Sequence, residues 1–206
     1  MINRRSIREE TVITFKEKII VTVIGVLVIS FVIWLSGVPG LLINGISHLS
    51  NNEDKYHNMA HQVEGEFVVE IDLSDLESNE GKILYDDKTQ IYISHLNVEN
   101  DSNYEVIFRS SGNYNTSGAS LVSGIEHATF NNEPSKIFQA EAKATYGGET
   151  FVLSPATSTD LVYRDGDKFG FYLFPEGEEV EIDLDTDPII EVEVTNLYRN
   201  LWVKKP

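Results

Sequence analysis

The feature that most constrains this chain is an uninterrupted apolar stretch near its beginning. Residues Ile19 to Ser36 contain no charged side chain, and only three of them carry a hydroxyl group. With Gly37 and Val38 the stretch reaches 20 residues. A helix rising about 1.5 Å per residue then crosses a hydrocarbon layer roughly 30 Å thick. We therefore predict a transmembrane helix over residues 19–38.

Two other interpretations of this stretch are weaker. A buried core helix would show an amphipathic period, which is missing here. A signal peptide has an apolar region of about 7 to 15 residues, and this one is longer. Cleavage near Gly40, which would release a secreted domain, stays open as an alternative. The side chains expected in the membrane anchor are Ile19, Ile20, Val21, Ile24, Leu27, Val28, Ile29, Phe31, Ile33, Trp34 and Leu35.

The basic residues around the stretch indicate its direction. Five precede it, namely Arg4, Arg5, Arg8, Lys16 and Lys18. Lys55 is the only basic residue between the stretch and Lys82. Because basic residues beside a span tend to remain in the cytoplasm, residues 1–18 are expected inside and the rest of the chain outside.

The charge of the remaining chain limits its partners. The whole chain has 206 residues and a net charge of −17, of which residues 1–18 contribute +2 and residues 19–206 contribute −19. So acidic a domain repels phosphate backbones, which argues against nucleic acid as a partner. The chain contains no cysteine, so disulfides, thiol nucleophiles and thiolate metal sites are excluded.

Residues 39–62 are expected to connect the anchor to the folded domain. A short apolar patch of Leu41, Leu42, Ile43 and Ile46 is expected at the membrane surface, followed by a polar spacer. Within it, His57 and His61 have the spacing of a zinc-binding helix, but Asn58 stands where such sites have glutamate. We expect no metal there.

From residue 63 onward the hydrophobic pattern has a period of two, which is typical of half-buried strands. Strands are expected at 67–73, 82–85, 90–96, 104–109, 137–145, 151–153, 161–164, 169–174, 180–184, 190–194 and 197–203. Gly147-Gly148 and Asp165-Gly166 between strands are typical of tight hairpin turns. We predict an all-β antiparallel sandwich, or a barrel-like fold, over residues 63–206.

The longest break in this pattern runs from Ser110 to Asn132 and is rich in Ser, Gly and Asn. A loop of that length in a compact domain is usually functional or mobile. Tyr114, with Asn113 and Asn115 on either side, is suited to stacking on a sugar while the amides bind its hydroxyl groups. These three residues form the candidate ligand loop.

Catalytic signatures are missing from the sequence. Asp183, Asp185 and Asp187 resemble the start of a calcium loop, but Pro188 occupies the position where its turn needs glycine. His95 and His127 are the histidines of the β region available as general bases. We therefore assign no catalytic, cofactor or metal residue.

The function expected from the sequence is binding. The chain is interpreted as a single-pass protein of the cell membrane, presenting an acidic β domain on the extracytoplasmic side. Its expected partners are the bilayer and another envelope protein or a wall component. An exported enzyme acting on envelope glycans or peptides through a site without a motif is the first alternative.

Overall fold

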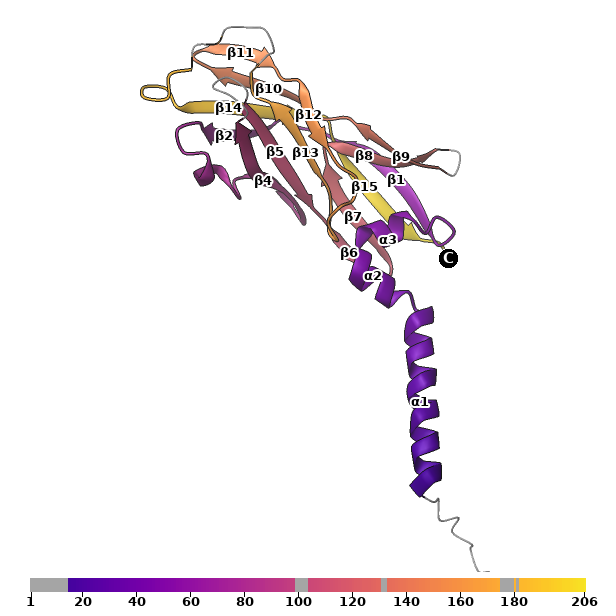
Figure 1. Cartoon of the computed structure of the whole chain (residues 1–206). Coiled ribbons are helices and arrows are strands. Elements are labelled where there is room, and N and C mark those ends of the chain that lie inside the picture. The colour runs from indigo at the N-terminus through magenta and orange to yellow at the C-terminus, as the bar shows by residue number, and fades with distance from the viewer. Residues whose placement is uncertain (1–14, 99–103, 131–132, 175–179, 181) are drawn as a thin grey trace, which may run out of the picture. The chain divides into compact units, whose positions relative to one another are not determined.

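A computed structural model of the chain describes residues 15–98, 104–130, 133–174, 180 and 182–206 (Figure 1). It contains two compact units, one ending at Pro39 and a larger one from Gly40 to Pro206. The helices are α1 (Phe15–Leu35), α2 (Val38–Asn44), α3 (Ile46–Ser50) and the 3-10 turn η1 (Glu77–Asn79). The strands are β1 (Tyr56–Val63), β2 (Phe67–Asp72), β3 (Ile83–Asp87), β4 (Thr89–Val98), β5 (Tyr104–Ser111), β6 (Asn113–Asn115), β7 (Gly118–Ser123), β8 (Ile125–Phe130), β9 (Glu133–Phe138), β10 (Glu141–Tyr146), β11 (Glu149–Val152), β12 (Pro155–Ser158), β13 (Lys168–Tyr172), β14 (Ile189–Thr195) and β15 (Leu197–Lys204).

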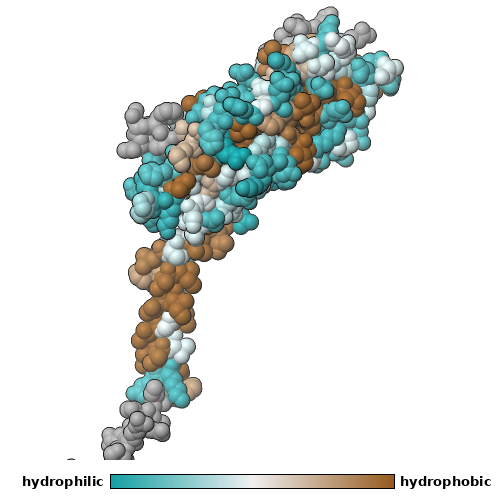
Figure 2. All heavy atoms as spheres, turned by 180° about the vertical axis from the view of Figure 1, so that it is seen from behind, coloured by the Kyte–Doolittle hydropathy of each residue, from teal (hydrophilic) through white to brown (hydrophobic). Residues whose placement is uncertain are grey.

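Helix α1 contains the apolar stretch from Ile19 to Leu35. None of its 21 residues is buried, and it is long and apolar enough to cross a membrane. Figure 2 shows its surface as a largely hydrophobic area. The helix begins and ends earlier than the predicted range 19–38. It ends at Leu35 because Gly37 adopts a φ of 75°. Pro39 lies in the first turn of α2, where its missing N–H is harmless.

Antiparallel strands build the larger unit, in agreement with the all-β prediction. They form sheet A (β1-β15-β7-β6), sheet B (β11-β10-β14-β2), sheet C (β12-β13-β5-β4-β3) and the β8-β9 hairpin. Sheets B and C both contribute their buried side chains to one large apolar core. This is the arrangement of a sandwich, and its core includes Ile71 and Val192 from sheet B and Ile93, Phe108 and Phe171 from sheet C.

The period-two pattern places these side chains as predicted. In β10, Ala142, Ala144 and Tyr146 are buried while the residues between them are exposed. The hairpin from β10 to β11 turns at Gly147 and Gly148, whose φ angles of 59° and 83° are those that a two-residue turn of this kind requires. The expected strand 137–145 is nevertheless broken at residues 139–140, so its first part belongs to β9 and its second to β10.

A second apolar cluster attaches α2 and α3 to the strands. It consists of Leu41, Ile46, Leu49, Ala119, Leu121, Leu161 and Trp202. The structure therefore differs from the spacer expected over residues 39–62. Two residues of the expected surface patch are buried in this cluster, and residues 56–63 are β1, paired along its length with β15. Alternating polar residues made β1 resemble a linker, since only one of its faces packs inward.

The expected loop from Ser110 to Asn132 is also replaced by strands. The structure forms β6, β7 and the whole of β8 there, whereas Asn131 and Asn132 lie outside the described residues. In β7, Leu121, Val122 and Ser123 are buried. Small and polar residues have low strand propensity, but pairing of β7 with β15 and packing override that preference.

Two expected strands near the end of the chain are turns instead. Residues 161–164 contribute only a single bridge, Tyr163 with Gly166. Of residues 180–184, Glu181 lies outside the described residues, and Asp183 begins a turn in which its carboxylate accepts the N–H groups of Asp185 and Thr186. Asp183 lies between the apolar residues Ile182 and Leu184, so this turn has the same alternating pattern as a strand and was predicted as one.

Candidate functional site

The candidate site is built around His127 in β8. Strand β8 pairs only with β9 among the described strands, so its other edge needs partners. Asn200 of β15 accepts the N–H of His127 through Oδ1 (2.7 Å), and Asn58 of β1 donates through Nδ2 to the His127 carbonyl (2.7 Å). Two side-chain amides therefore take the place of a neighbouring strand and fix the backbone at His127.

A buried carboxylate holds the imidazole ring. Nε2 of His127 lies 2.6 Å from Oδ2 of Asp167, and the hydroxyl of Ser123 donates to both oxygens of the same carboxylate (2.8 and 2.9 Å). Asp167 and Ser123 are fully buried, and His127 is only 4% exposed. An ionised Asp167 carboxylate can only accept a hydrogen bond, so in that state Nε2 carries the ring proton and donates a hydrogen bond to Oδ2. Nδ1 is left facing away from this pair.

The turn before Asp167 fixes the position of that carboxylate. Arg109 Nη2 and Ser111 Oγ both donate to Asp165, at 2.9 and 2.8 Å. Burial raises the pKa of Asp165, but the hydrogen bonds from Ser111 and Arg109 outweigh it and hold that pKa below its usual value. Gly166 is required between the two acids because a Cβ there would lie 2.0 Å from a backbone oxygen of β5.

Nδ1 of His127 faces a small polar pocket. The pocket has a volume of about 150 Å³ and is lined by Ser50, Asn58, His127, Ala128, Ser135, Lys136 and Asp160. Oδ1 of Asp160 lies 4.0 Å from Nδ1, and the Asp160 side chain is 71% exposed. Lys136 is directly opposite His127 in the β8-β9 hairpin, so both side chains emerge on one face. The pocket thus combines one fixed imidazole nitrogen with charges of both signs.

This arrangement has two chemical capacities. With the proton on Nε2, Nδ1 of the neutral ring carries a lone pair and accepts a hydrogen bond or a proton. The Asp160 carboxylate accepts as well, whereas the Lys136 ammonium donates. A small ligand that carries an amino or hydroxyl group on one side and an anionic group on the other matches this distribution of charges.

Metal binding has no comparable support. Within the described residues, no group of three or more His, Asp or Glu side chains is placed to hold an ion. His57 and His61 are exposed on β1, opposite Val203 and Arg199, and not on a helix. The carboxylate of Asp183, first in the calcium-like series, is occupied by the N–H groups of its own turn.

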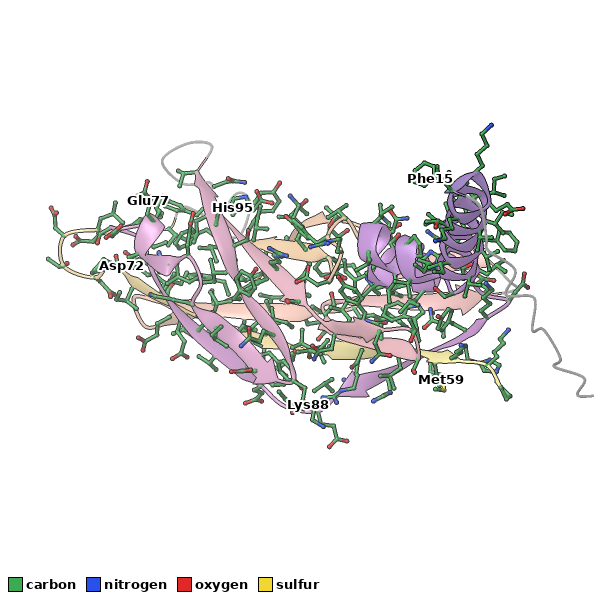
Figure 3. All side chains as sticks on the ribbon, turned by 90° about the horizontal axis from the view of Figure 1, so that it is seen from below. Phe15, Met59, Asp72, Glu77, Lys88 and His95 are labelled. Carbon is green, nitrogen blue, oxygen red and sulfur yellow. The ribbon has the colours of Figure 1, made fainter. Side chains whose placement is uncertain are left out.

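The predicted ligand residues lie on an edge strand and do not line this pocket. Asn113, Tyr114 and Asn115 form β6. Tyr114 packs against the cluster of α2 and α3, and Asn115 Oδ1 accepts the N–H of Ser117 (2.7 Å). Figure 3 shows His95 toward the end of the larger unit that also carries Glu77, away from α3, so the second candidate base does not join His127.

Sequence reasoning identified His127 as an available base but missed its partners. Asp167, Asn200 and Asp160 are 40, 73 and 33 residues away along the chain, so no local spacing signals them. Asn58 was noticed only because it replaces the glutamate of a zinc motif. Its amide instead fixes the backbone of the histidine in the site.

No protein-family model matches this chain. No curated protein matches it, and neither does any solved structure.

Proposed function

We propose that the chain is a single-pass membrane protein that presents its β domain on the extracytoplasmic side as a binding module of the cell envelope. The pocket at His127 is the proposed binding site. Its ligand is a small polar group, of the size of one sugar or one amino acid, on a wall component or an envelope protein.

The proposed location is supported by the composition of α1 and by the basic residues before it. All 18 residues from Ile19 to Ser36 are uncharged, and a charged residue in mid-membrane is costly. Five basic residues precede this stretch and a strongly acidic domain follows it. Protease added to intact cells should digest the β domain and spare residues 1–18. Digestion only after lysis would contradict this orientation.

The observation that carries the proposed binding is the buried Asp167 that fixes His127 while Nδ1 faces the pocket. Burying a carboxylate is costly in free energy unless it is paired. The pairing of Asp167 with His127 therefore favours a functional role for the pocket that the ring faces. Wall polymers consist of amino sugars and short peptides, which carry the amino, hydroxyl and carboxylate groups that Asp160, Nδ1 and Lys136 complement.

Binding can be followed through Trp202, whose ring centroid lies 6.1 Å from that of His127. In a Trp34→Phe background Trp202 is the only tryptophan, since the chain contains two. Titration with glucosamine and with short wall peptides should change its fluorescence saturably, and Asp160→Asn should weaken that binding. Asp187→Asn, which removes an exposed acid outside the pocket, is the matched control. An equal effect of both variants would contradict the assignment of the site.

One observation favours a second function, an exported hydrolase. His127 with the proton on Nε2 has the geometry of a general base oriented by a carboxylate. Ser123 is bonded to Asp167 and not to Nδ1, so the base would have to activate water or a substrate hydroxyl. Turnover of envelope glycans or peptides that His127→Gln abolishes and His95→Gln preserves would establish this function. Saturable binding without turnover would contradict the hydrolase and support the binding module.

A further inference from the structure

Helix α2 exposes two large apolar side chains at a fixed place on the larger unit. Leu42 and Ile43 are 63% and 70% exposed, whereas Leu41 beside them is buried. Arg164 holds the helix, because its Nη1 donates to the Leu42 carbonyl (3.1 Å) and its own carbonyl accepts the N–H of Ile46 (2.8 Å). Since α2 is bound to the folded unit, Leu42 and Ile43 are not free to turn inward.

A short connector keeps this helix near the end of α1. Helix α1 ends at Leu35 and the larger unit begins at Gly40, so only four residues separate them. An extended chain advances at most about 3.6 Å per residue, which places Leu35 and Gly40 within about 18 Å of each other at any angle between the units. The headgroup layer on each side of a bilayer is itself about 5 to 8 Å thick. If α1 crosses the hydrocarbon, α2 begins in or beside the headgroups.

The charge of this end differs from that of the rest of the unit. Residues 40–206 contain 30 acidic and 11 basic side chains. Backbone hydrogen bonds tie Lys205 to the segment after α3, from its N–H to Lys55 O (2.8 Å), and Lys204 to the turn before β7, from its N–H to Ser117 O (3.0 Å). In α2, α3 and the segments bonded to them the basic residues are Lys55, Arg164, Lys204 and Lys205, and the acidic ones are Glu53, Asp54, Asp160 and Asp165, so the two signs balance at this end while acids dominate the rest of the unit. Basic residues close to a membrane surface are attracted to anionic headgroups.

From these three observations we propose that the α2 end of the larger unit docks on the surface of the bilayer that α1 crosses. Leu42 and Ile43 insert among the headgroups, and the four basic residues face anionic lipids. Asp72 and Glu77 lie at the opposite end of the unit from α3, so in this arrangement their end points away from the membrane (Figure 3). This inference rests on the proposed membrane anchoring by α1. It also places the His127 pocket, which Ser50 of α3 helps to line, in the membrane-proximal part of the unit.

The absence of native cysteine allows a direct test in the full chain. Single substitutions Leu42→Cys and Ile43→Cys are labelled with an environment-sensitive fluorophore, and the protein is reconstituted in vesicles of phosphatidylcholine and phosphatidylglycerol. Val28→Cys in α1 reports on the anchor. Val152→Cys in β11, 75% exposed, is the matched control for an apolar position on the strands. Each label is quenched by aqueous iodide and, separately, by nitroxide-bearing lipids.

The proposal expects labels at 42 and 43 to be quenched by nitroxide lipids and to be several-fold less accessible to iodide than the label at 152. Iodide access at 42 and 43 equal to that at 152, with the label at 28 protected, would overturn the docking and leave the anchoring intact. Iodide access at 28 would overturn both. Protection from iodide without nitroxide quenching would show that a protein surface covers the two side chains, and would also overturn the proposal.

Discussion

Replacing His127 by leucine tests whether Asp167 is a charged group that depends on its partner. The substitution keeps an apolar side chain in the site but removes the Nε2–H bond of 2.6 Å. The fully buried carboxylate is then left with only the Ser123 hydroxyl as a side-chain partner, and leaving a buried charge uncompensated costs about 3 to 5 kcal/mol. We expect His127→Leu to lower the free energy of unfolding by that amount and the Tm by roughly 10 °C or more.

A second substitution separates the charge from the shape of the site. Asp167→Asn keeps the size of the side chain and allows His127 to move its proton to Nδ1 and accept the amide N–H, so it should cost only about 1 to 2 kcal/mol. In that background His127→Leu no longer leaves a charge unpaired. Its cost should fall by about 2 kcal/mol, which is the coupling free energy of the pair.

Urea unfolding of the full chain in detergent micelles provides the measurement. Trp202, which is buried beside His127, reports unfolding of the β domain in a Trp34→Phe background. His95→Leu is the control, because the His95 ring has only Ser94 Oγ as a hydrogen-bond partner among the described residues, and its loss should cost less than about 1 kcal/mol. The reasoning is refuted if His127→Leu costs no more than His95→Leu, or if the cycle shows no coupling.

Two further predictions concern the turns that support the site. Gly45 has a φ of 55°, and a Cβ there would lie 1.8 Å from the Arg164 carbonyl oxygen. Gly45→Ala should therefore lower the Tm much more than Gly81→Ala, which meets a similar backbone strain (φ 80°) with no atom within 4 Å. Equal Tm shifts in calorimetry would contradict a role for the Arg164 carbonyl in limiting this position. The lowered pKa of Asp165 means that its bonds to Ser111 and Arg109 contribute stability above the pKa of the unfolded carboxyl, and this is lost as the pH falls through the lower folded value. Urea midpoints of Asp165→Asn should therefore lie below those of the parent chain at neutral pH and approach them in acid, whereas a constant difference would contradict this assignment.

The sequence predicts a strand well where its side chains alternate between the core and the solvent. Strands β2, β10 and β14 alternate buried and exposed residues, so their faces are visible in the sequence. Strand β7 is different, since its sequence GASLVS contains small and polar residues that sheet pairing and packing nevertheless bury. The same composition was interpreted as a loop, because propensity records the preference of single residues and not the partners that the topology supplies.

The site was less predictable than the fold for a related reason. A histidine becomes chemically distinctive only through its partners, and here these come from β1, β15 and the segment before β13. Only the folded unit, in which β8 is hydrogen-bonded to Asn58 of β1 and Asn200 of β15, brings them together. The one local clue, Lys136 opposite His127 across the hairpin, requires the register of β8 and β9 to be known first.

The hydrogen bonds of Asn58, Asn200 and Asp167 to His127 therefore contribute to both stability and binding. Strands β8 and β9 pair only with each other among the described strands, and the chain has no disulfide that would fasten them. Asn58, Asn200 and Asp167 attach β8 to the rest of the unit and at the same time orient His127 in the pocket. Substituting any of them changes stability together with binding. Asp160 lines the pocket with a side chain that is 71% exposed, so a loss of binding in Asp160→Asn at unchanged stability would be attributable to the pocket itself.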